Sequence, residues 1–305
     1  MIFVSGTKRS GTSMWMQVLA AAGVPILGRA FPRNWARTLR EANPEGFYES
    51  LLRQGVYYRT NPHPTTGEYF LPDQVEGYAV KVFVPGVVRS ERAYIRRLVA
   101  NVRAWRDYAA SMARLHALED RAMAEAAARS AEAEPSPSEP VRFPPVFEWW
   151  MENFALVRDI SLRRYPARLQ AYDRVVDAPA QILGPALEWL GVPDIDAGLA
   201  AVRPELRTQV DSELALEAAP ELPLEPRHAR VFDELYAAIH DGAALDGALL
   251  STLNQTNREL LPRLRQVQAK VAAYQVRVSR ANPRRAEAVA GLPECSSGAG
   301  PLTDP

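Results

Sequence analysis

The amino-acid sequence predicts an α/β protein with a doubly wound, mostly parallel sheet and a C-terminal helical extension. Short apolar runs alternate with stretches whose apolar residues have helical spacing, as in βαβ units. The first apolar run ends in a glycine-rich loop that opens a helix, which is typical of phosphate-binding α/β domains. Beyond about residue 215, a proline-punctuated linker is followed only by helical patterns.

The composition limits the classes of function. The chain has 305 residues, of which 47% are hydrophobic and 24% charged, enough for one or two domains with a buried core. Its net charge is zero, so no overall field attracts nucleic acid or an anionic membrane. Cys295 is the only cysteine, which excludes an internal disulfide and fits a reducing, cytoplasmic compartment. Neither a signal-peptide pattern nor an apolar run long enough for a membrane span is expected.

The first elements surround the glycine-rich loop. Residues 2–5 (IFVS) are expected to form a buried strand. Residues 12–22 are expected to form a helix that ends with Gly23 in a left-handed conformation. Residues 78–84 (YAVKVFV) follow as a second strand, stopped by the Pro-Gly pair at 85–86.

The middle of the chain repeats the alternation. Residues 97–103 are expected to form a third strand, followed by a helix from about 107 to 128. The proline-rich stretch 129–145 is interpreted as an inserted connector or lid. A helix at 147–164 then leads to a strand at 167–173.

One more helix completes the predicted α/β domain. It follows in "APAQILGPALEWLGV", with Pro179 near its first turn and Gly191 just past its end. Strands that alternate with helices predict a parallel sheet covered on both faces. We therefore assign residues 1–215 to one α/β domain.

The remainder of the chain is predicted to be a helical extension over 216–282 and a disordered tail over 283–305. One helical face carries Val231, Phe232, Leu235, Tyr236 and Ile239. Further on, a coiled-coil-type spacing joins Leu260, Leu264, Val267, Val271, Tyr274 and Val278. Pro262 is expected in the first turn of that helix. The seam predicts either packing on the chain's own domain or a homodimer interface.

The loop "GTKRSGTS", Gly6 to Ser13, predicts a phosphate site. Its glycines and final hydroxyl match the GxxxxGK[ST] pattern, but Thr12 stands where the lysine belongs. The backbone cradle survives this change, since it consists of N–H groups at a helix N-terminus. Lys8 and Arg9 supply positive charge earlier in the loop. The loop thus favours a terminal phosphate-like group without ordinary triphosphate chemistry; the alternative is a glycine–serine turn with surface cations.

The segment "RSGTS" resembles the first motif, (K/R)SGT(T/S), of the sulfotransferase family. That family transfers a sulfuryl group from 3′-phosphoadenosine 5′-phosphosulfate (PAPS). The resemblance implies a P-loop-like 5′-phosphosulfate loop. Its donor-binding residues would be Arg9, Ser10, Gly11, Thr12 and Ser13. Lys8, also expected to bind the donor, stands where the family often has proline.

A second motif of the family is an arginine at a strand end with a serine eight residues later. Arg103 and Ser111 in "RAWRDYAAS" match it, and an arginine fork with a hydroxyl suits a phosphate. The family usually has Asp-Pro or Asn-Pro after the arginine, where this chain has Ala104-Trp105. The alternative is a strand-end arginine in an arginine-rich chain.

The block "QAYDRVVDAPAQILGPALEWLGVP" resembles the C-terminal block of bacterial sulfotransferases. By this resemblance Tyr172 lies near the adenine, where stacking on a base contributes about 1–3 kcal/mol. The alternative is a core tyrosine. The resemblance covers roughly residues 1–210 and implies a doubly wound P-loop fold.

The general base is not where many eukaryotic relatives have it, in a K-x-H-x-P segment. Here the segment is "KVFVP": Lys81 and Pro85 match, but Phe83 replaces the histidine. The stretch "NPEGFYES", 43–50, resembles a block of bacterial sulfotransferases, and some family members use a glutamate as base. Glu49 is therefore the expected base, with Glu45 as second choice.

Charge stabilisation is expected from cations at the phosphate loop. Arg9, with Lys8 and Lys81, would neutralise the leaving nucleotide phosphate. Of the chain's three lysines, Lys8 lies in the glycine-rich loop and Lys81 lies in the predicted strand at 78–84. No metal is expected. The four histidines of the chain are scattered and do not have metal-ligand spacing: His63, His116, His228 and His240.

The sequence thus predicts a PAPS-dependent sulfotransferase acting on a hydroxyl of a small molecule, sugar or lipid. The loops at 44–77 and 116–146 are expected to shape the acceptor pocket. The pairs Trp149-Trp150 and Tyr57-Tyr58 either line that pocket or belong to the core. A P-loop nucleotide kinase is one alternative, and a non-catalytic nucleotide-binding protein that lost the base is the other.

Overall fold

The computed structural model describes residues 1–31, 43–57, 61, 69–129, 140–203 and 224–281. Five parallel strands form one sheet in the order β2-β3-β1-β4-β5, which confirms the predicted parallel α/β fold. The strands are β1 (Ile2–Gly6), β2 (Ile26–Leu27), β3 (Ala79–Lys81), β4 (Arg97–Val102) and β5 (Ala167–Ala171).

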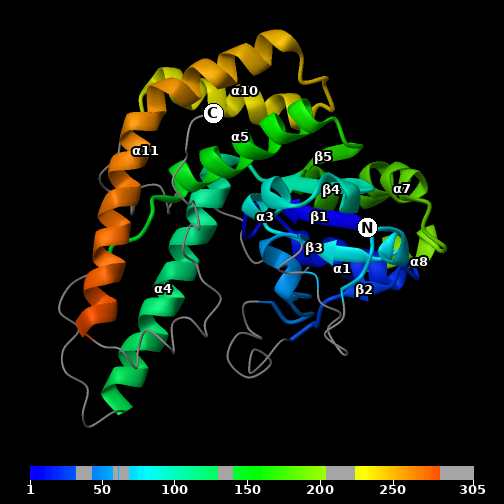
Figure 1. The fold of residues 1–305 in the computed structure, drawn as a ribbon, viewed down its shortest axis with the longest axis horizontal. Helices are drawn as coiled ribbons and strands as arrows, with labels where there is room; N and C mark the ends of the chain where they lie inside the picture. Colours follow the sequence, from blue (N-terminus) through cyan, green and yellow to red (C-terminus); the bar gives the residue numbers. More distant parts are fainter. Residues whose placement is uncertain (32–42, 58–60, 62–68, 130–139, 204–223, 282–305) are drawn as a thin grey trace.

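The helices lie on both faces of the sheet and beyond it (Figure 1). Within the described residues, the α-helices are α1 (Thr12–Ala21), α3 (Val84–Arg89), α4 (Trp105–Arg129), α5 (Pro145–Arg163), α6 (Tyr172–Asp177), α7 (Pro179–Leu190), α8 (Ile195–Ala200), α10 (Pro226–His240) and α11 (Gly247–Ala281). Short 3₁₀ turns are η1 (Leu51–Gln54), η2 (Asp73–Val75) and η3 (Arg92–Tyr94).

The two faces of the sheet follow from the alternation of side chains along β1, all five of whose residues are buried. Phe3 faces the layer that contains α3 and α5, where it joins Leu98 of β4 in one apolar cluster. Ile2 and Val4 face the layer of α1, α7 and α8 and join Val99. A strand that is buried on both faces has a nearly continuous apolar sequence, and the segment IFVS has such a sequence.

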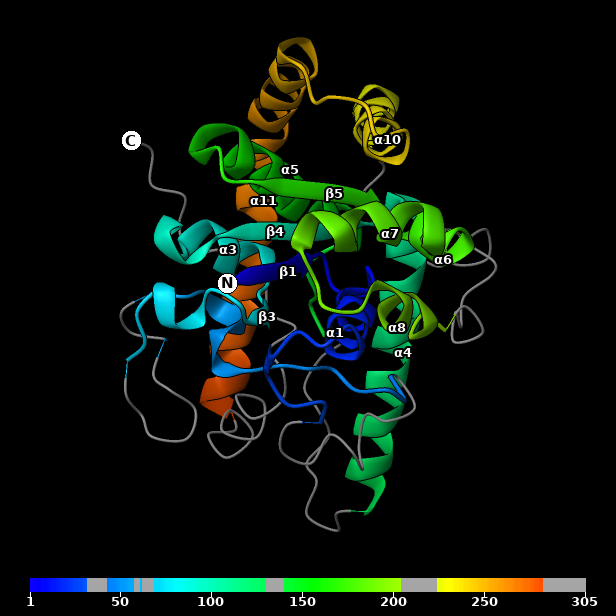
Figure 2. The ribbon, with the colours of Figure 1, turned by 90° about the vertical axis from the view of Figure 1, so that its right-hand side faces the viewer.

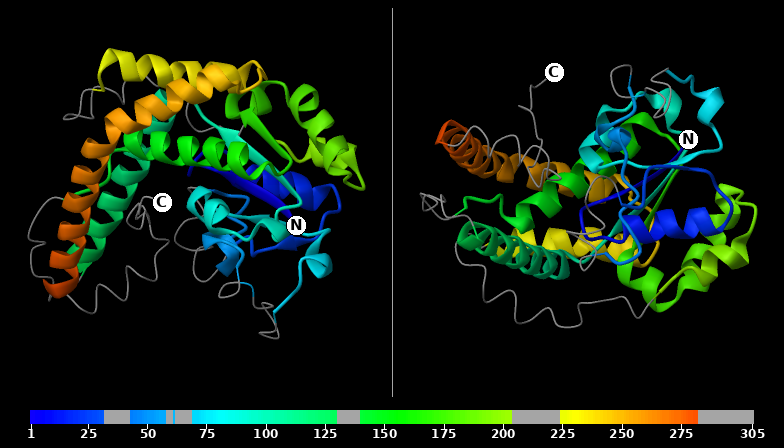
Figure 3. Two further views of the ribbon diagram at one scale, coloured as in Figure 1. Left: turned by 45° about the horizontal axis from the view of Figure 1, so that its top comes forward. Right: turned by 90° about the horizontal axis from the view of Figure 1, so that it is seen from below.

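A third apolar core lies beyond the sheet, where α10 and α11 pack against α4 and α5 (Figures 1 and 3). Phe232 of α10 stacks on Trp150 of α5 at 4.6 Å between ring centroids and lies 5.4 Å from the Trp149 ring. Both tryptophans are fully buried. They belong to this core, so they do not line an acceptor pocket.

The predicted seam of α11 is covered by the chain itself over most of its length. Its members in the third core are Leu260, Leu264, Val267 and Val271. This burial agrees with the interpretation of packing on the chain's own helices, while a homodimer through the C-terminal helices stays a prediction. The placement of Pro262 was wrong: α11 begins at Gly247, so this proline lies inside it. A proline there removes an intrahelical hydrogen bond and favours a bend, and α11 changes direction along its length (Figure 1).

Two predicted strands are shorter than expected. β3 ends at Lys81 rather than at residue 84, and Pro85 and Gly86 lie in α3, because proline needs no N–H partner in a first helical turn. β5 ends at Ala171, and Tyr172 begins α6. The sequence patterns also missed β2 and α8, which are too short to show a clear period.

Other boundaries agree with the sequence. Gly23 has the predicted left-handed backbone, with a φ of 82°, and Gly191 directly follows α7 as predicted, with a φ of 70°. Most of the proline-rich connector, the linker after residue 215 up to 223 and the tail 283–305 lie outside the described residues. Among the described helices, none is long and apolar enough to cross a membrane.

The topology indicates where a candidate ligand site would lie, at the carboxyl ends of the strands. The chain leaves β1 through α1 toward β2 on one side, whereas it leaves β4 toward β5 on the other. The carboxyl ends of β1 and β4 are neighbours, with Gly6 paired with Asn101. α/β proteins bind ligands at such a switch point, so the loop after β1 and the turn after β4 form the candidate site.

Candidate functional site

The backbone of the glycine-rich loop is left-handed at two residues before α1. Arg9 and Gly11 have positive φ, 63° and 85°, and Gly11 precedes the first residue of α1. A Cβ on Gly6 would lie 2.5 Å from the carbonyl oxygen of Asn101, and a Cβ on Gly11 would lie 2.7 Å from the Tyr172 ring. Since real Cβ atoms do not approach so closely, both positions require glycine.

The loop exposes hydrogen-bond donors suited to an anion. No side chain caps α1, because Gly11 occupies the N-cap, and backbone N–H groups at a helix N-terminus bind phosphate. The Thr7 hydroxyl is fully buried and has no hydrogen-bond partner within the described residues. The Ser10 hydroxyl donates to the Thr7 carbonyl oxygen at 2.6 Å and closes the loop. The orphaned Thr7 hydroxyl beside this cradle fits a phosphate-bearing ligand.

Arg103 and Ser111, which match the second sulfotransferase motif, contact Arg9 of this loop. Arg9 Nε donates to Ser111 Oγ at 3.4 Å across 102 residues of sequence. Arg103 Nη1 donates to the backbone oxygen of Arg9 at 3.3 Å. Burial, followed by the charge of Arg103, lowers the pKa of Arg9. Two guanidinium groups crowded into a buried site favour a bound anion between them.

Tyr172 lies beside the same loop. Its ring edge contacts Gly11, and the guanidinium carbon of Arg103 lies 5.1 Å from the ring centroid. The residue is only half-buried, which argues against the alternative of a core tyrosine. An aromatic face next to a cationic loop can stack on a base.

A second group of charges lies where β3 ends, next to β1. Lys81 Nζ donates to Glu49 Oε1 at 3.3 Å, to Ser13 Oγ at 3.2 Å and to the Phe47 backbone oxygen at 3.1 Å. Burial lowers the pKa of Lys81, and the adjacent Glu49 opposes that shift. Buried Lys81 and Glu49 therefore form one hydrogen-bonded network with Ser13, which is half-buried at the start of α1.

Glu49 is held from both sides. Its other oxygen, Oε2, accepts a hydrogen bond from Arg53 Nη1 at 2.6 Å, and the residue is only 8% exposed. Phe83, which stands at the position of the family's histidine, lies under the Arg53 guanidinium at 5.9 Å. Glu45, the second choice as base, is exposed. The structure therefore places Glu49, and not Glu45, in the buried network.

Lys8 points to a different partner from Arg9. Its Nζ lies 3.1 Å from Glu148 Oε1 on α5, and Glu148 Oε2 accepts a hydrogen bond from Tyr108 on α4 at 2.8 Å. No sequence motif identified Glu148 or Tyr108 as site residues. Their helices could be predicted, but no motif relates them to the loop.

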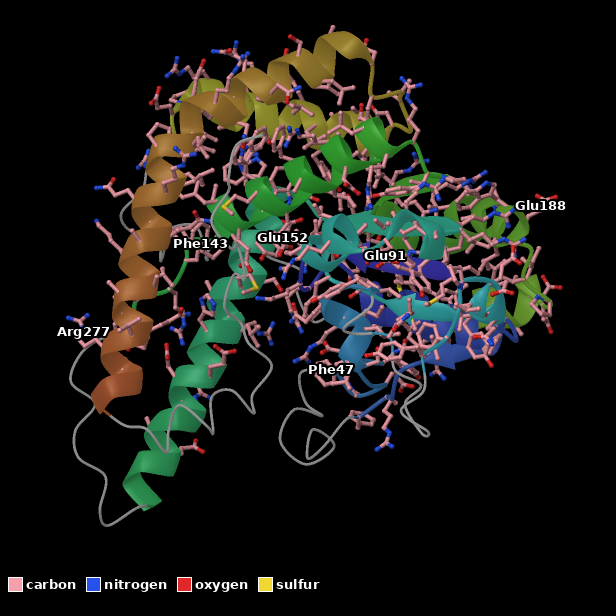
Figure 4. All side chains as sticks on the ribbon, viewed as in Figure 1. Phe47, Glu91, Phe143, Glu152, Glu188 and Arg277 are labelled. Carbon is pink, nitrogen blue, oxygen red and sulfur yellow. The ribbon has the colours of Figure 1, made fainter. Side chains whose placement is uncertain are left out.

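The carboxyl of Glu152, one turn after Glu148 on α5, should make the stability of the protein depend on pH (Figure 4). Burial, then the charge of Glu148, raises its pKa from 4.5 to about 8. The folded state therefore binds a proton that the unfolded state loses, so stability should fall as pH rises from about 4.5 to about 8. We expect the Glu152→Gln variant to gain melting temperature relative to the wild type as pH rises through this window.

The matched control for this measurement is Glu188→Gln, at an exposed position on α7 (Figure 4). Its melting-temperature difference from the wild type should stay nearly constant with pH. Melting curves followed by circular dichroism across pH 5–8 measure both variants. A Glu152→Gln difference that is equally independent of pH would contradict this assignment.

The histidines and the pair Tyr57-Tyr58 were also singled out from the sequence. Burial, then the charge of Arg142, lowers the pKa of His116 to about 4, so the side chain is neutral near pH 7. His228 pairs with Glu259 between α10 and α11. His63 and Tyr58 lie outside the described residues. No group of three or more potential metal ligands occurs among the described residues.

Comparison with known proteins identifies no family: no family model matches the chain, and no curated protein matches it significantly.

Proposed function

We propose that this protein transfers a sulfuryl group from PAPS to a hydroxyl of a small-molecule, sugar or lipid acceptor. The observation that carries the proposal is the contact between Arg9 and Ser111, 102 residues apart. The sulfotransferase resemblance assigns both residues to one donor nucleotide from separate motifs. Their meeting at the switch point of the sheet supports that assignment.

In this proposal the donor is bound along the loop. The loop N–H groups, with Arg9 and Ser13, hold the 5′-phosphosulfate. Arg103 and Ser111 hold the second phosphate of the nucleotide, and Tyr172 flanks the adenine. The Gly11 position supports close approach, since any side chain there would displace the Tyr172 ring.

The transfer itself needs positioning and charge more than covalent help. The acceptor oxygen attacks sulfur in line, the bond from sulfur to the bridging phosphate oxygen breaks, and 3′,5′-adenosine bisphosphate (PAP) leaves with that electron pair. Glu49 accepts the hydroxyl proton. Lys81 and Arg53 fix its orientation, and each carboxylate oxygen keeps a lone pair for the acceptor. The leaving phosphate is neutralised by Arg9 and Lys81. Lys8 adds its charge when it leaves Glu148 and binds the donor.

The kinase alternative is disfavoured by the surroundings of Ser13. In P-loop NTPases the hydroxyl at this position binds Mg²⁺. Here Ser13 Oγ lies 3.2 Å from the buried ammonium of Lys81, which supplies positive charge at that hydroxyl from the protein itself. Lys81 is the last residue of β3 and Arg103 directly follows β4, and neither is a carboxylate that could hold the metal.

Titration calorimetry with PAP tests the proposed donor site. Arg9→Ala and Arg103→Ala should each weaken PAP binding by roughly 10- to 150-fold, since a charged hydrogen bond contributes about 1.5–3 kcal/mol. Arg277→Ala, at an exposed position on α11, is the control and should bind as the wild type does (Figure 4). Equal affinities in all three variants would exclude the assigned site.

A further inference from the structure

Helix α10 of the C-terminal extension contacts the chain directly after Arg103. The Trp105 indole N–H donates to Asp233 Oδ1 at 2.7 Å. Arg106 donates to both carboxylate oxygens of Asp233, at 2.6 and 3.2 Å, and its guanidinium carbon lies 4.1 Å from the Trp105 ring centroid. A bidentate pair stacked on an indole fixes the geometry of this turn.

The same helix contacts the chain directly after Tyr172. The Tyr236 hydroxyl donates to Asp173 Oδ1, and Arg174 Nη1 donates to the backbone oxygen of His240 at 2.6 Å. These contacts attach the start of α6 to α10, which lies against β5 (Figure 2). One helix thus holds the segments that follow both β4 and β5.

A third contact reaches Arg103 itself. The Trp149 indole N–H donates to the Arg103 backbone oxygen at 2.7 Å, and the Trp149 ring packs against Phe232 of α10. The Arg103 guanidinium in turn lies over the Tyr172 ring, 5.1 Å from its centroid. A chain of contacts through Trp149 thus connects Arg103 and Tyr172 with α10.

We propose that α10 is a positioning element for the nucleotide site, with Asp233 and Tyr236 holding Arg103 and Tyr172 at the separation that the nucleotide requires. This inference rests on the proposed function, because it assumes that these two residues bind PAP and PAPS. It means that binding of the donor depends on α10, which lies in a part of the chain that the sulfotransferase resemblance does not cover. It also accounts for Trp105, which stands where the family has a proline: its indole N–H joins this turn to α10.

Calorimetric titration of the full-length protein with PAP tests the inference. Asp233→Ala and Tyr236→Phe should each raise the Kd for PAP by roughly 2- to 30-fold, the range for residues that act on a site without touching the ligand. Tyr236→Phe removes a single hydroxyl, so the fold is retained even if Asp233→Ala is less stable. Glu234→Ala, at the exposed neighbouring position on α10, is the matched control and should leave the Kd unchanged.

A double-mutant cycle separates positioning from general destabilisation. If Asp233 acts through Arg103, Asp233→Ala should cause little further loss of PAP affinity in an Arg103→Ala background. The same factor of loss with and without Arg103 would overturn the inference, as would wild-type affinity in both α10 variants. If the wild-type protein itself binds no PAP, the proposed function fails and the inference fails with it.

Discussion

The Glu49→Gln variant is expected to lose sulfuryl transfer by roughly 10²–10⁴-fold, the range of a general base. Glutamine keeps the shape of the side chain but cannot accept the acceptor proton. PAP binding should persist, because the loop, Arg103 and Ser111 are untouched. The measurement is release of PAP from PAPS, followed by chromatography in the presence of mixed hydroxyl-bearing sugars, lipids and small alcohols.

This substitution also leaves the buried Lys81 without its carboxylate, so stability must be followed separately. Glu49→Asp keeps the charge and serves as the control for that effect: it should fold like the wild type and retain part of the turnover. Full turnover in Glu49→Gln would exclude Glu49 as the base. A wild type that binds PAP but never consumes PAPS would instead favour the non-catalytic alternative, in which Phe83 reflects the loss of a histidine.

The Phe232→Ala variant is expected to lose about 3–5 kcal/mol of the free energy of unfolding. The Phe232 ring is fully buried and contacts the rings of Trp105, Trp149 and Trp150, with centroid distances of 6.1, 5.4 and 4.6 Å. Its removal opens a cavity in the middle of the third core. Thermal unfolding should show a fall in melting temperature on the order of 10 °C.

Leu162→Ala is the control for this measurement, because Leu162 is 67% exposed and its truncation should change stability by less than about 0.5 kcal/mol. A similarly small effect for Phe232→Ala would mean that α10 contributes little to the fold. The same result would weaken the case that α10 positions the nucleotide site.

Much of the fold could be predicted because its long elements have clear periods. β4 and α5 agree with the patterns to within two residues at each end. The patterns failed where an element is only a few residues long, as in β2. They also failed where a residue belongs to a different element from the one expected. Pro85 is one such residue: the sequence pattern predicts that it ends a strand, but it lies in the first turn of α3.

The candidate site could be predicted where residues lie next to each other in a motif or follow a parallel strand. Arg9, Ser13 and Arg103 are of this kind, because carboxyl ends of parallel strands share one edge of the sheet. The partners supplied by helix packing could not be predicted. Glu148, which binds Lys8, and Asp233, which binds Trp105, lie on helices whose position depends on tertiary contacts that carry no local signal.

Thermal unfolding with two nucleotides distinguishes a PAPS site from a nucleoside-triphosphate site. PAP without metal, at about 100 times its Kd, is compared with ATP plus magnesium at the same concentration. A ligand bound at about 100 times its Kd adds about 2.7 kcal/mol of stability. We expect a rise in melting temperature of roughly 5–10 °C with PAP and little rise with ATP and magnesium. A rise only with ATP and magnesium would contradict it and would identify a nucleoside-triphosphate site despite Thr12.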